Sequence, residues 1–385
     1  MTADMQARIA SVDAGYCAKK LDAIIRRIQK GVKFYVNLRA AHTGAGTGIG
    51  LGRKDGADMS TIVKAGIVSL AAVLLLPGGG KKKAAQLPPM VLVVEQPSAQ
   101  AQTLRVLEGG EVETLGMEEY LTRVVLSEMP VSFAPEARKA QVVAARTFAV
   151  RQMQCGKHPD ADVCTDSACC QACLSIQELQ QRYADTFDGV WEDARQVVED
   201  TGDEVLLYDG ALIDAVYFSC SGGTTEDAAA VWGSAVAYLQ SVPSPGEQRA
   251  ARYASTVSVP ADMFAQTLQS MEPGITLGAD QAAWVTQITR TAGGGVDTAI
   301  IGGRSFAGTA LRRAFGLNST KFTLQWENGA FQFDVLGFGH RVGMSQYGAD
   351  AIARLGFDYQ TILRYYYRGA EIKKAALLTQ DSSLV

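Results

Sequence analysis

Apolar positions recur at helical spacing near the middle of the chain, and this pattern predicts two consecutive helices. The first covers Met117 to Glu128, and the second, which is rich in alanine, covers Glu136 to Gln152. Pro130 ends the first helix, and Pro135 opens the second because proline suits the first turn. The apolar face of the first helix carries Met117, Leu121, Val124 and Val125.

Glu128 lies at the end of that apolar face. A carboxylate in such a position is either the solvent-exposed rim of a buried surface or a group in a low-dielectric pocket, where desolvation raises its pKa. The second state is the one that a general acid requires. The second helix carries Gln141 and Phe148 on one face and Lys139 and Arg146 on another. These side chains suit sugar rings and oxygens, and the helical period alone leaves both alternatives open.

Strand patterns lie on both sides of the helices. Val91 to Glu95 is rich in β-branched residues, and TLRVLEGGEVETL alternates around Gly109-Gly110 as a hairpin does. After a helical segment, SIQELQQRYADTF, three further strands are predicted in ARQVVED, DEVLLYD and ALIDAVYFS. Their turns are Thr201-Gly202 and Asp209-Gly210.

The last of these strands leads into the loop SCSGGTTED. Its hydroxyl and carboxylate oxygens belong to Ser219, Ser221, Thr224 and Glu226, among others. Loops that follow rigid strands often carry binding groups, although a simple polar turn has the same composition.

The composition changes after Pro245, where PSPGEQ is typical of a linker. The segment that follows predicts a helix in PADMFAQTLQSM, strands in WVTQITRT and VDTAIIG, and a hairpin that turns at Asn328-Gly329. We therefore expect residues 246–331 to form a second lobe, inserted into a catalytic lobe of residues 86–245 and 332–378.

The predicted fold is α+β with two lobes, in which the helical hairpin and an antiparallel sheet form a cleft with the smaller β-rich lobe. The chain returns to the first lobe through GFGHRVGMSQYGA, a glycine-rich loop that predicts close backbone approach. His340, Ser345 and Gln346 in this loop are candidate binding residues, and a histidine among glycines can equally be structural.

The N-terminal part has a different character. Residues 1–58 include the glycine-rich TGAGTGIGLGRKDGAD, which lacks the preceding strand and the GK[ST] ending of a phosphate loop and so favours a flexible linker. Residues 62–80 approach the length that crosses a bilayer core of about 30 Å. Because no A-x-A site follows, an uncleaved single-pass anchor is favoured over a removed signal peptide, with translation beginning at Met59.

Composition narrows the function classes. The chain is 47% hydrophobic and 20% charged, which is typical of globular proteins. Its net charge of -4 provides no general basic surface, so nucleic acid is not an expected partner. Three histidines cannot supply a two-histidine catalytic metal site beside the cluster described next, which counts against an amidase or peptidase.

Soft metal donors gather after the second helix. Adjacent cysteines suit a disulfide poorly, because disulfide geometry requires a particular Cα separation. The spacing H-x5-C-x4-C-C differs from zinc-finger pairs, but one histidine with three cysteines is a closed, structural zinc set, and Zn²⁺ is the predicted cofactor. The predicted ligands are His158, Cys164, Cys169 and Cys170.

Three motif blocks in this order resemble the stage II sporulation protein D family of glycan-cleaving cell-wall proteins: LSEMPVSF, EARKAQVVAARTFAV and GFGHRVGMSQYGADAIARLG. The resemblance covers about residues 91–374. It implies that Glu128 is the catalytic acid/base of a lytic transglycosylase and that the SGG-x-TE loop and the His340 loop line its cleft. Some members have a zinc site of the form H-x5-C-x4-H-C, in which Cys169 here replaces the second histidine.

The resemblance further implies a place in the cell and partners. The catalytic part would lie outside the cytoplasm, on the mother-cell membrane and facing the intermembrane space during engulfment. Its partners would be peptidoglycan glycan strands, an amidase that removes stem peptides, and other engulfment membrane proteins.

We therefore expect a membrane-anchored lytic transglycosylase that forms a 1,6-anhydro sugar, for which one carboxylate suffices because the C6 hydroxyl of the substrate replaces water. One alternative is a non-catalytic glycan-binding or amidase-enhancing protein. Another is a hydrolase that uses Glu226 as its second carboxylate. Beside Glu128, the expected substrate-binding residues are Lys139, Gln141, Arg146, Ser219, Ser221, Thr224, Glu226, His340, Ser345 and Gln346.

Overall fold

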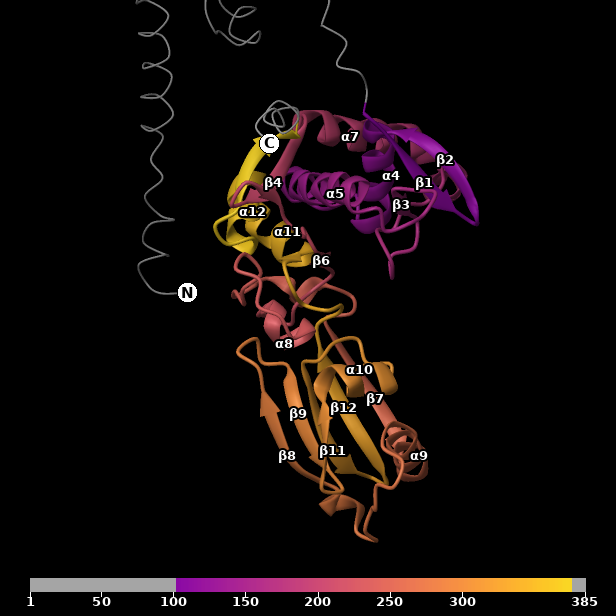
Figure 1. Ribbon diagram of the computed structural model, residues 1–385, viewed down its shortest axis with the longest axis vertical. Helices are drawn as coiled ribbons and strands as arrows, with labels where there is room; N and C mark the ends of the chain where they lie inside the picture. Colours follow the sequence, from indigo (N-terminus) through magenta and orange to yellow (C-terminus); the bar gives the residue numbers. More distant parts are fainter. Residues whose placement is uncertain (1–101, 376–385) are drawn as a thin grey trace, which may run out of the picture. The chain divides into compact units, whose positions relative to one another are not determined.

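The computed structural model describes residues 102–375 (Figure 1). The predictions for residues 1–58, for the apolar segment 62–80 and for the strand from Val91 to Glu95 fall outside this range. Within residues 102–375, no helix combines the length and the apolar character that crossing a membrane requires.

The described chain begins with the predicted hairpin. Strands β1 (Thr103–Glu108) and β2 (Glu111–Gly116) pair antiparallel, and β3 (Val163–Cys164) joins β1 in parallel. Gly109 and Gly110 have φ values of 59° and 96°, which glycine adopts without steric cost in a two-residue turn. The hairpin prediction is confirmed.

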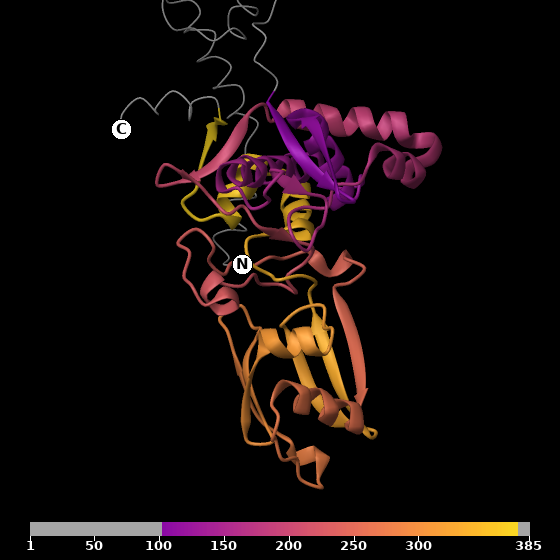
Figure 2. The ribbon, with the colours of Figure 1, turned by 45° about the vertical axis from the view of Figure 1, so that its right-hand side comes forward.

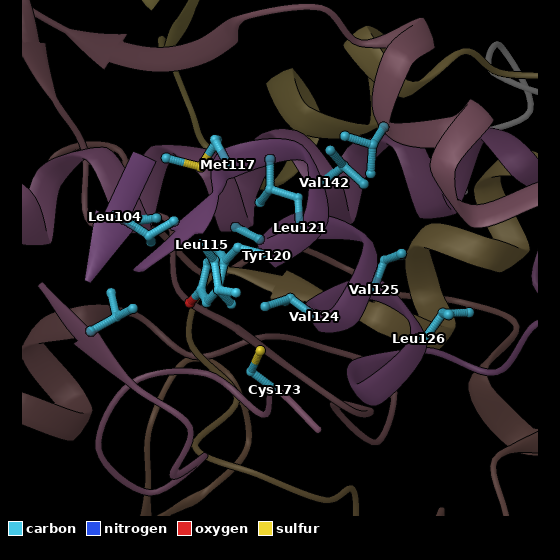
Figure 3. Packing of buried hydrophobic residues seen from close by; sticks show 14 of the residues in the cluster. Leu104, Leu115, Met117, Tyr120, Leu121, Val124, Val125, Leu126, Val142 and Cys173 are labelled. Carbon is cyan, nitrogen blue, oxygen red and sulfur yellow. The ribbon is translucent and has the colours of Figure 1, made fainter. Parts of the chain in front are cut away.

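Two helices follow as predicted: α4 (Met117–Glu128) and α5 (Pro135–Cys155). Gly156 ends α5 in the left-handed region with a φ of 63°. Figure 3 shows the apolar face of α4, with Leu121, Val124 and Val125 in one cluster with Leu104 and Leu115 of the hairpin. Burying each such side chain contributes about 1.5–3 kcal/mol, so this core fixes the end of α4.

The prediction of a strand in ARQVVED was wrong. After α6 (Ile176–Tyr183) and the short turn η1 (Ala184–Thr186), helix α7 covers Phe187–Asp200. Its buried residues are Ala194, Val197 and Val198, which follow the i, i+3, i+4 spacing of a helix face packed on α4. The β-branched pair favoured a strand, but burial against α4 overrides that weak local preference.

A second small sheet has the order β14-β4-β5, from β4 (Glu204–Tyr208), β5 (Ala211–Leu212) and β14 (Glu371–Lys374). The predicted turn at Asp209-Gly210 joins β4 to β5 and is confirmed. The segment ALIDAVYFS is not one strand, because irregular chain separates β5 from β6 (Tyr217–Phe218). β6 instead pairs in parallel with β13 (Met344–Ser345).

Residues 254–336 have a hydrophobic cluster of their own, in which the Phe264 and Phe331 rings stack with centroids 3.9 Å apart. Two three-stranded sheets, β11-β12-β7 and β10-β9-β8, carry this cluster (Figure 2). The predicted helix, strands and Asn328-Gly329 hairpin are confirmed. The elements are β7 (Ala254–Pro260), α9 (Ala261–Met271), η3 (Gln281–Ala283), β8 (Val285–Arg290), β9 (Val296–Ile301), β10 (Arg304–Ala307), α10 (Gly308–Ala314), β11 (Phe322–Glu327) and β12 (Ala330–Leu336).

The remaining elements are α8 (Ala228–Trp232), η2 (Glu247–Arg249), α11 (Gln346–Arg354) and α12 (Tyr359–Tyr366). Helices α11 and α12 pack on α5, with Ile362, Leu363 and Tyr366 buried. The fold is α+β with several small sheets, as predicted at this level. The division into an interrupted catalytic lobe and an inserted lobe that close a cleft stays a prediction.

Candidate active site

Glu128, the last residue of α4, lies half-buried in the wall of a cavity. Its Oε1 accepts a hydrogen bond from the Ala172 amide at 2.8 Å, and its Oε2 lies 3.4 Å from Nε2 of Gln346. Burial raises the pKa of Glu128, and the hydrogen bonds from Ala172 and Gln346 only partly oppose this effect. The carboxyl group is therefore suited to hold a proton above the ordinary pH range of glutamate.

Two cavities meet at Glu128. The first, of about 430 Å³, is lined by apolar and polar side chains, and the second, of about 350 Å³, shares Glu128, Ser219 and Gln346 with it. A carboxyl group that is reachable from both sides fits a chain-like substrate that continues past the reacting bond. The side chains around the first cavity include Phe148, Gln171, Tyr217, Phe218, Ser219, Phe338, His340 and Gln346.

Neutral hydrogen bonds hold the polar wall of the first cavity. The Tyr217 hydroxyl donates to Oε1 of Gln171 at 2.7 Å, and Nε2 of Gln171 donates to the Tyr120 hydroxyl at 3.1 Å. Nε2 of Gln346 also lies 3.4 Å from Oε1 of the buried Gln141. Sequence reasoning identified Gln141 and Gln346 but missed Tyr217 and Gln171, although Gln171 directly follows the cysteine cluster.

His340 lines the same cavity, but both of its ring nitrogens bond within the protein. Nε2 donates to the Tyr217 carbonyl at 3.0 Å, and Nδ1 accepts from the Val342 amide at 3.2 Å. Burial lowers the pKa of His340 to about 4, so the ring is neutral at physiological pH. The expectation that an imidazole nitrogen binds a sugar hydroxyl is therefore replaced by a wall role, since only the ring surface is free.

The predicted close approach at the glycine loop is confirmed. β6 and β13 bring the Ser219 loop beside the His340 loop, and further bridges join Cys220 to Phe338 and Glu226 to Val342. Gly343 has a φ of 81°, and a Cβ there would lie 2.2 Å from the Val216 carbonyl oxygen. These two loops form one rigid wall beside Glu128.

Glu247 anchors the paired loops from beneath, and sequence reasoning missed it because it placed PSPGEQ in a linker. Its carboxylate accepts hydrogen bonds from the Ser221 hydroxyl at 2.8 Å, the Ser345 hydroxyl at 2.5 Å and the Ser244 hydroxyl at 2.7 Å. Ser345 also accepts from the Gly348 amide as the N-cap of α11. Ser221 and Ser345, predicted to bind substrate, are thus completely buried and support the loops instead.

Glu226 is likewise structural. Its side chain is 1% exposed, its Oε1 pairs with Nη1 of Arg341 at 2.9 Å, and the Gly295 amide donates to it at 3.0 Å. Arg341 also donates to the Thr224 carbonyl at 2.8 Å. Because Glu226 is buried in this ion pair and lines neither cavity at Glu128, the hypothesis of Glu226 as a second catalytic carboxylate is wrong. The Arg341 partner was also missed from sequence.

Two further predicted binding residues lie away from the cavity. The guanidinium group of Arg146 is buried and donates to the Glu204 carbonyl at 3.1 Å and to the Thr201 hydroxyl at 3.0 Å. Lys139 pairs with Glu136 and Asp200, both at 3.0 Å. The structure therefore gives Arg146 and Lys139 stabilising roles in place of direct sugar contact. Of the predicted binding residues, Ser219, His340 and Gln346 line the cavity.

The four predicted metal ligands come together. The donor atoms of His158, Cys164, Cys169 and Cys170 all lie within 4.8 Å of one another. Nε2 of His158 lies 3.4 Å from Sγ of Cys170 and 3.8 Å from Sγ of Cys169. Tetrahedral zinc, with Zn–N about 2.0 Å and Zn–S about 2.3 Å, requires N···S separations of about 3.5 Å. The donor set fits a metal ion.

This cluster is directly linked to Glu128. The loop that carries Cys169 and Cys170 continues to Gln171, which lines the cavity, and to Ala172, whose amide bonds Glu128. β3, which ends at Cys164, secures the other side of the loop by pairing with β1. A metal ion here would therefore fix the position of a hydrogen-bond donor on the carboxylate.

Comparison with known proteins assigns the family. The sequence profile described as Stage II sporulation protein (SpoIID) matches residues 108–208. Stage II sporulation protein D of Bacillus subtilis (strain 168) is 38% identical over 69% of this chain and 76% of its own length. The chain belongs to the SpoIID family.

Two other SpoIID-like relatives extend the comparison. Stage II sporulation protein D of Bacillus amyloliquefaciens is 37% identical over 69% of this chain and 76% of its own length. A Bacillus subtilis protein named Amidase enhancer is 26% identical over 66% of this chain, which spans 40% of that relative. The resemblance predicted from the three motif blocks is confirmed, and this SpoIID family member is related to sporulation proteins.

Proposed function

We propose that this SpoIID family member cleaves the glycan strands of peptidoglycan during sporulation, as a lytic transglycosylase in which Glu128 is general acid and base. One observation carries the proposal. Glu128 is the single carboxylate among the residues that line the two cavities meeting there, and its pKa is raised by burial. A glycoside hydrolase generally needs two carboxyl groups about 5–9.5 Å apart, whereas a transglycosylase that uses its substrate's hydroxyl needs one.

In the proposed reaction, protonated Glu128 donates its proton to the glycosidic oxygen as the C1–O bond breaks. The resulting carboxylate then accepts the proton of the C6 hydroxyl, while the C6 oxygen forms a new bond to C1 and closes the 1,6-anhydro ring. The Ala172 amide, 2.8 Å from Oε1, supports the carboxylate stage. The carboxyl group is protonated again at the end, so no water enters the reaction.

Substitution of Glu128 tests this function. Glu128→Gln keeps the side-chain shape but cannot transfer a proton, so we expect cleavage of purified peptidoglycan strands to fall by about 10²–10⁴-fold. Strand binding and thermal unfolding should stay close to those of the parent. Glu118→Gln, on the exposed side of the same helix, is the matched control and should retain activity. Activity of Glu128→Gln within about tenfold of the control would exclude this role.

We further propose that His158, Cys164, Cys169 and Cys170 hold a structural Zn²⁺ ion, whose chemistry is to fix the loop by coordination. The fit of the four donors supports this assignment. Metal analysis after exhaustive dialysis should give about one zinc per chain, and Cys164→Ser should lower both zinc content and thermal stability. A disulfide among these cysteines in a zinc-free, fully folded chain would contradict the assignment.

The cellular setting is also proposed. The apolar segment 62–80 supports a membrane anchor, with the described residues outside the cytoplasm and an amidase and other engulfment proteins as partners. A cysteine placed between Gln96 and Gln102 should react with a membrane-impermeant thiol reagent in intact cells. Labelling only after lysis would contradict this topology.

The likeness to Amidase enhancer favours a second candidate, a non-catalytic protein that binds glycan and stimulates an amidase. In that case the wild-type chain leaves glycan strands intact, and Glu128→Gln does not alter stimulation of the amidase.

A further inference from the structure

A third cavity, of about 530 Å³, continues from the one that holds Glu128. The two share Phe338 and His340 as common walls. Beyond that wall, the third cavity is lined by Trp232 at the end of α8 and by Arg312 and Arg313 in α10. A glycan strand that passes Glu128 can therefore extend into a space with an aromatic surface and two cations.

Trp232 is unusually exposed for its size, with 48% of its surface accessible. Its ring lies 5.6 Å from the His340 ring, centroid to centroid, which holds it against the shared wall. Gly233 ends α8 directly after it, with a φ of 79°. A large apolar surface that stays exposed at a cavity is typical of a ligand contact, and aromatic rings stack on the apolar faces of sugars.

Arg312 is half-buried without a carboxylate partner. Its Nε donates to the Leu317 carbonyl at 3.3 Å, which orients the guanidinium group. Across residues 102–375, neither Arg312 nor Arg313 has a carboxylate oxygen within 4.0 Å, although other arginines do. The Arg312 charge also acts on the shared wall, where it adds to burial in lowering the pKa of His340. A partly desolvated cation of this kind favours an anionic ligand.

A simpler role for the two arginines is to complement the dipole at the end of α10. The exposed Arg313 can do this in solvent. That role does not require Arg312 to be half-buried in a cavity wall beside an exposed tryptophan.

We propose that Trp232, Arg312 and Arg313 form a binding subsite for a sugar that carries a free carboxylate. Trp232 stacks on the sugar ring, and the guanidinium groups pair with the carboxylate. In peptidoglycan, such a sugar is a muramyl unit whose lactyl carboxylate bears no stem peptide. This assignment rests on the proposed function for its substrate, but it concerns binding and not bond cleavage.

The test measures binding by titration calorimetry on the full chain in mild detergent, in the Glu128→Gln background so that strands stay intact. Three probes are compared: an N-acetylglucosamine–N-acetylmuramic acid oligosaccharide with free lactyl carboxylates, the same oligosaccharide with these groups converted to methyl amides, and the same strand with stem peptides. We expect the free acid to bind at least about tenfold more tightly than the amide.

The variants locate the effect. Arg312→Gln with Arg313→Gln should remove the preference for the free acid, and Trp232→Ala should weaken both the acid and the amide. Arg304→Gln, an exposed arginine in β10, is the matched control and should bind like the parent. Thermal unfolding of each variant shows whether it has folded.

Equal binding of free acid and amide by the unsubstituted cavity would overturn the subsite, and this comparison needs no variant of the cavity to fold. Tight binding of the peptide-bearing strand that depends on the same arginines would overturn the lactyl assignment. If wild-type chain cleaves nothing but the binding preference remains, the proposed function fails while the subsite stands.

Discussion

Glu128 and Glu226 are carboxylates in two neighbouring regions of this protein, and they are held in opposite ways. Glu128 lies at the meeting of two cavities with one backbone amide at 2.8 Å and one weak amide contact. Glu226 is 1% exposed and fixed by Arg341 at 2.9 Å. An unpaired carboxyl group can change its protonation state, whereas one held by a buried cation stabilises structure.

The largest expected effect on stability comes from the second region. Glu226→Gln leaves Arg341 as an uncompensated buried charge, so the free energy of unfolding should fall by roughly 3–5 kcal/mol. Glu128→Gln should change it far less. Denaturant titrations of the two variants check this difference. Similar unfolding free energies for both variants would break the comparison.

Ser345 gives a smaller effect in the same region. Ser345→Ala removes a hydrogen bond to the buried Glu247 carboxylate and the N-cap of α11, and it should cost roughly 1.5–3 kcal/mol. Ser219→Ala, in the cavity wall, is the control and should cost less. If Ser345→Ala weakens strand binding at full stability, then Ser345 contacts substrate after all.

The pH dependence of stability sharpens the comparison on the Glu128 side. Because burial raises its pKa in the folded chain, the folded chain binds more protons than the unfolded chain above the ordinary pKa of about 4.3. The Glu128 contribution to stability is therefore present at low pH and is lost as pH rises through the raised folded pKa, by at most about 1.4 kcal/mol per pH unit.

Glu128→Gln should lack this loss. The unfolding free energy of the variant minus that of the parent should increase as pH rises across this range, as measured by denaturant titration at several pH values. A constant difference would mean that the pKa of Glu128 is not raised.

Lys139→Ala should have the smallest effect. Its two ion pairs involve partly exposed carboxylates, so about 0–1 kcal/mol of stability should be lost and the rate of strand cleavage should not change. A large loss of cleavage in a stable Lys139→Ala variant would restore the original expectation that Lys139 binds substrate.

The sequence was sufficient where one local pattern decides the outcome. The apolar face of α4, the prolines between the helices and the glycine turns predicted elements that the structure contains. Glu128 followed from the same pattern, since it continues a buried face. The metal cluster was predictable because its ligands lie close together in the chain.

The rest depends on contacts that are distant in sequence. Ser221 and Glu226 have the side-chain types of a binding loop, but sequence cannot show that they point toward Glu247 and Arg341. Glu247 was hidden in a segment with the composition of a linker. The α7 helix was missed because its β-branched pair favours a strand until packing on α4 is known.

The most direct test of the central claim is the mass of the products that the wild-type chain releases from peptidoglycan strands. A single acid/base at Glu128 predicts new chain ends with the 1,6-anhydro ring, each one water lighter than the corresponding reducing end, and none from Glu128→Gln. Reducing ends without the anhydro ring would require an activated water and a second catalytic group, and that result would contradict the account.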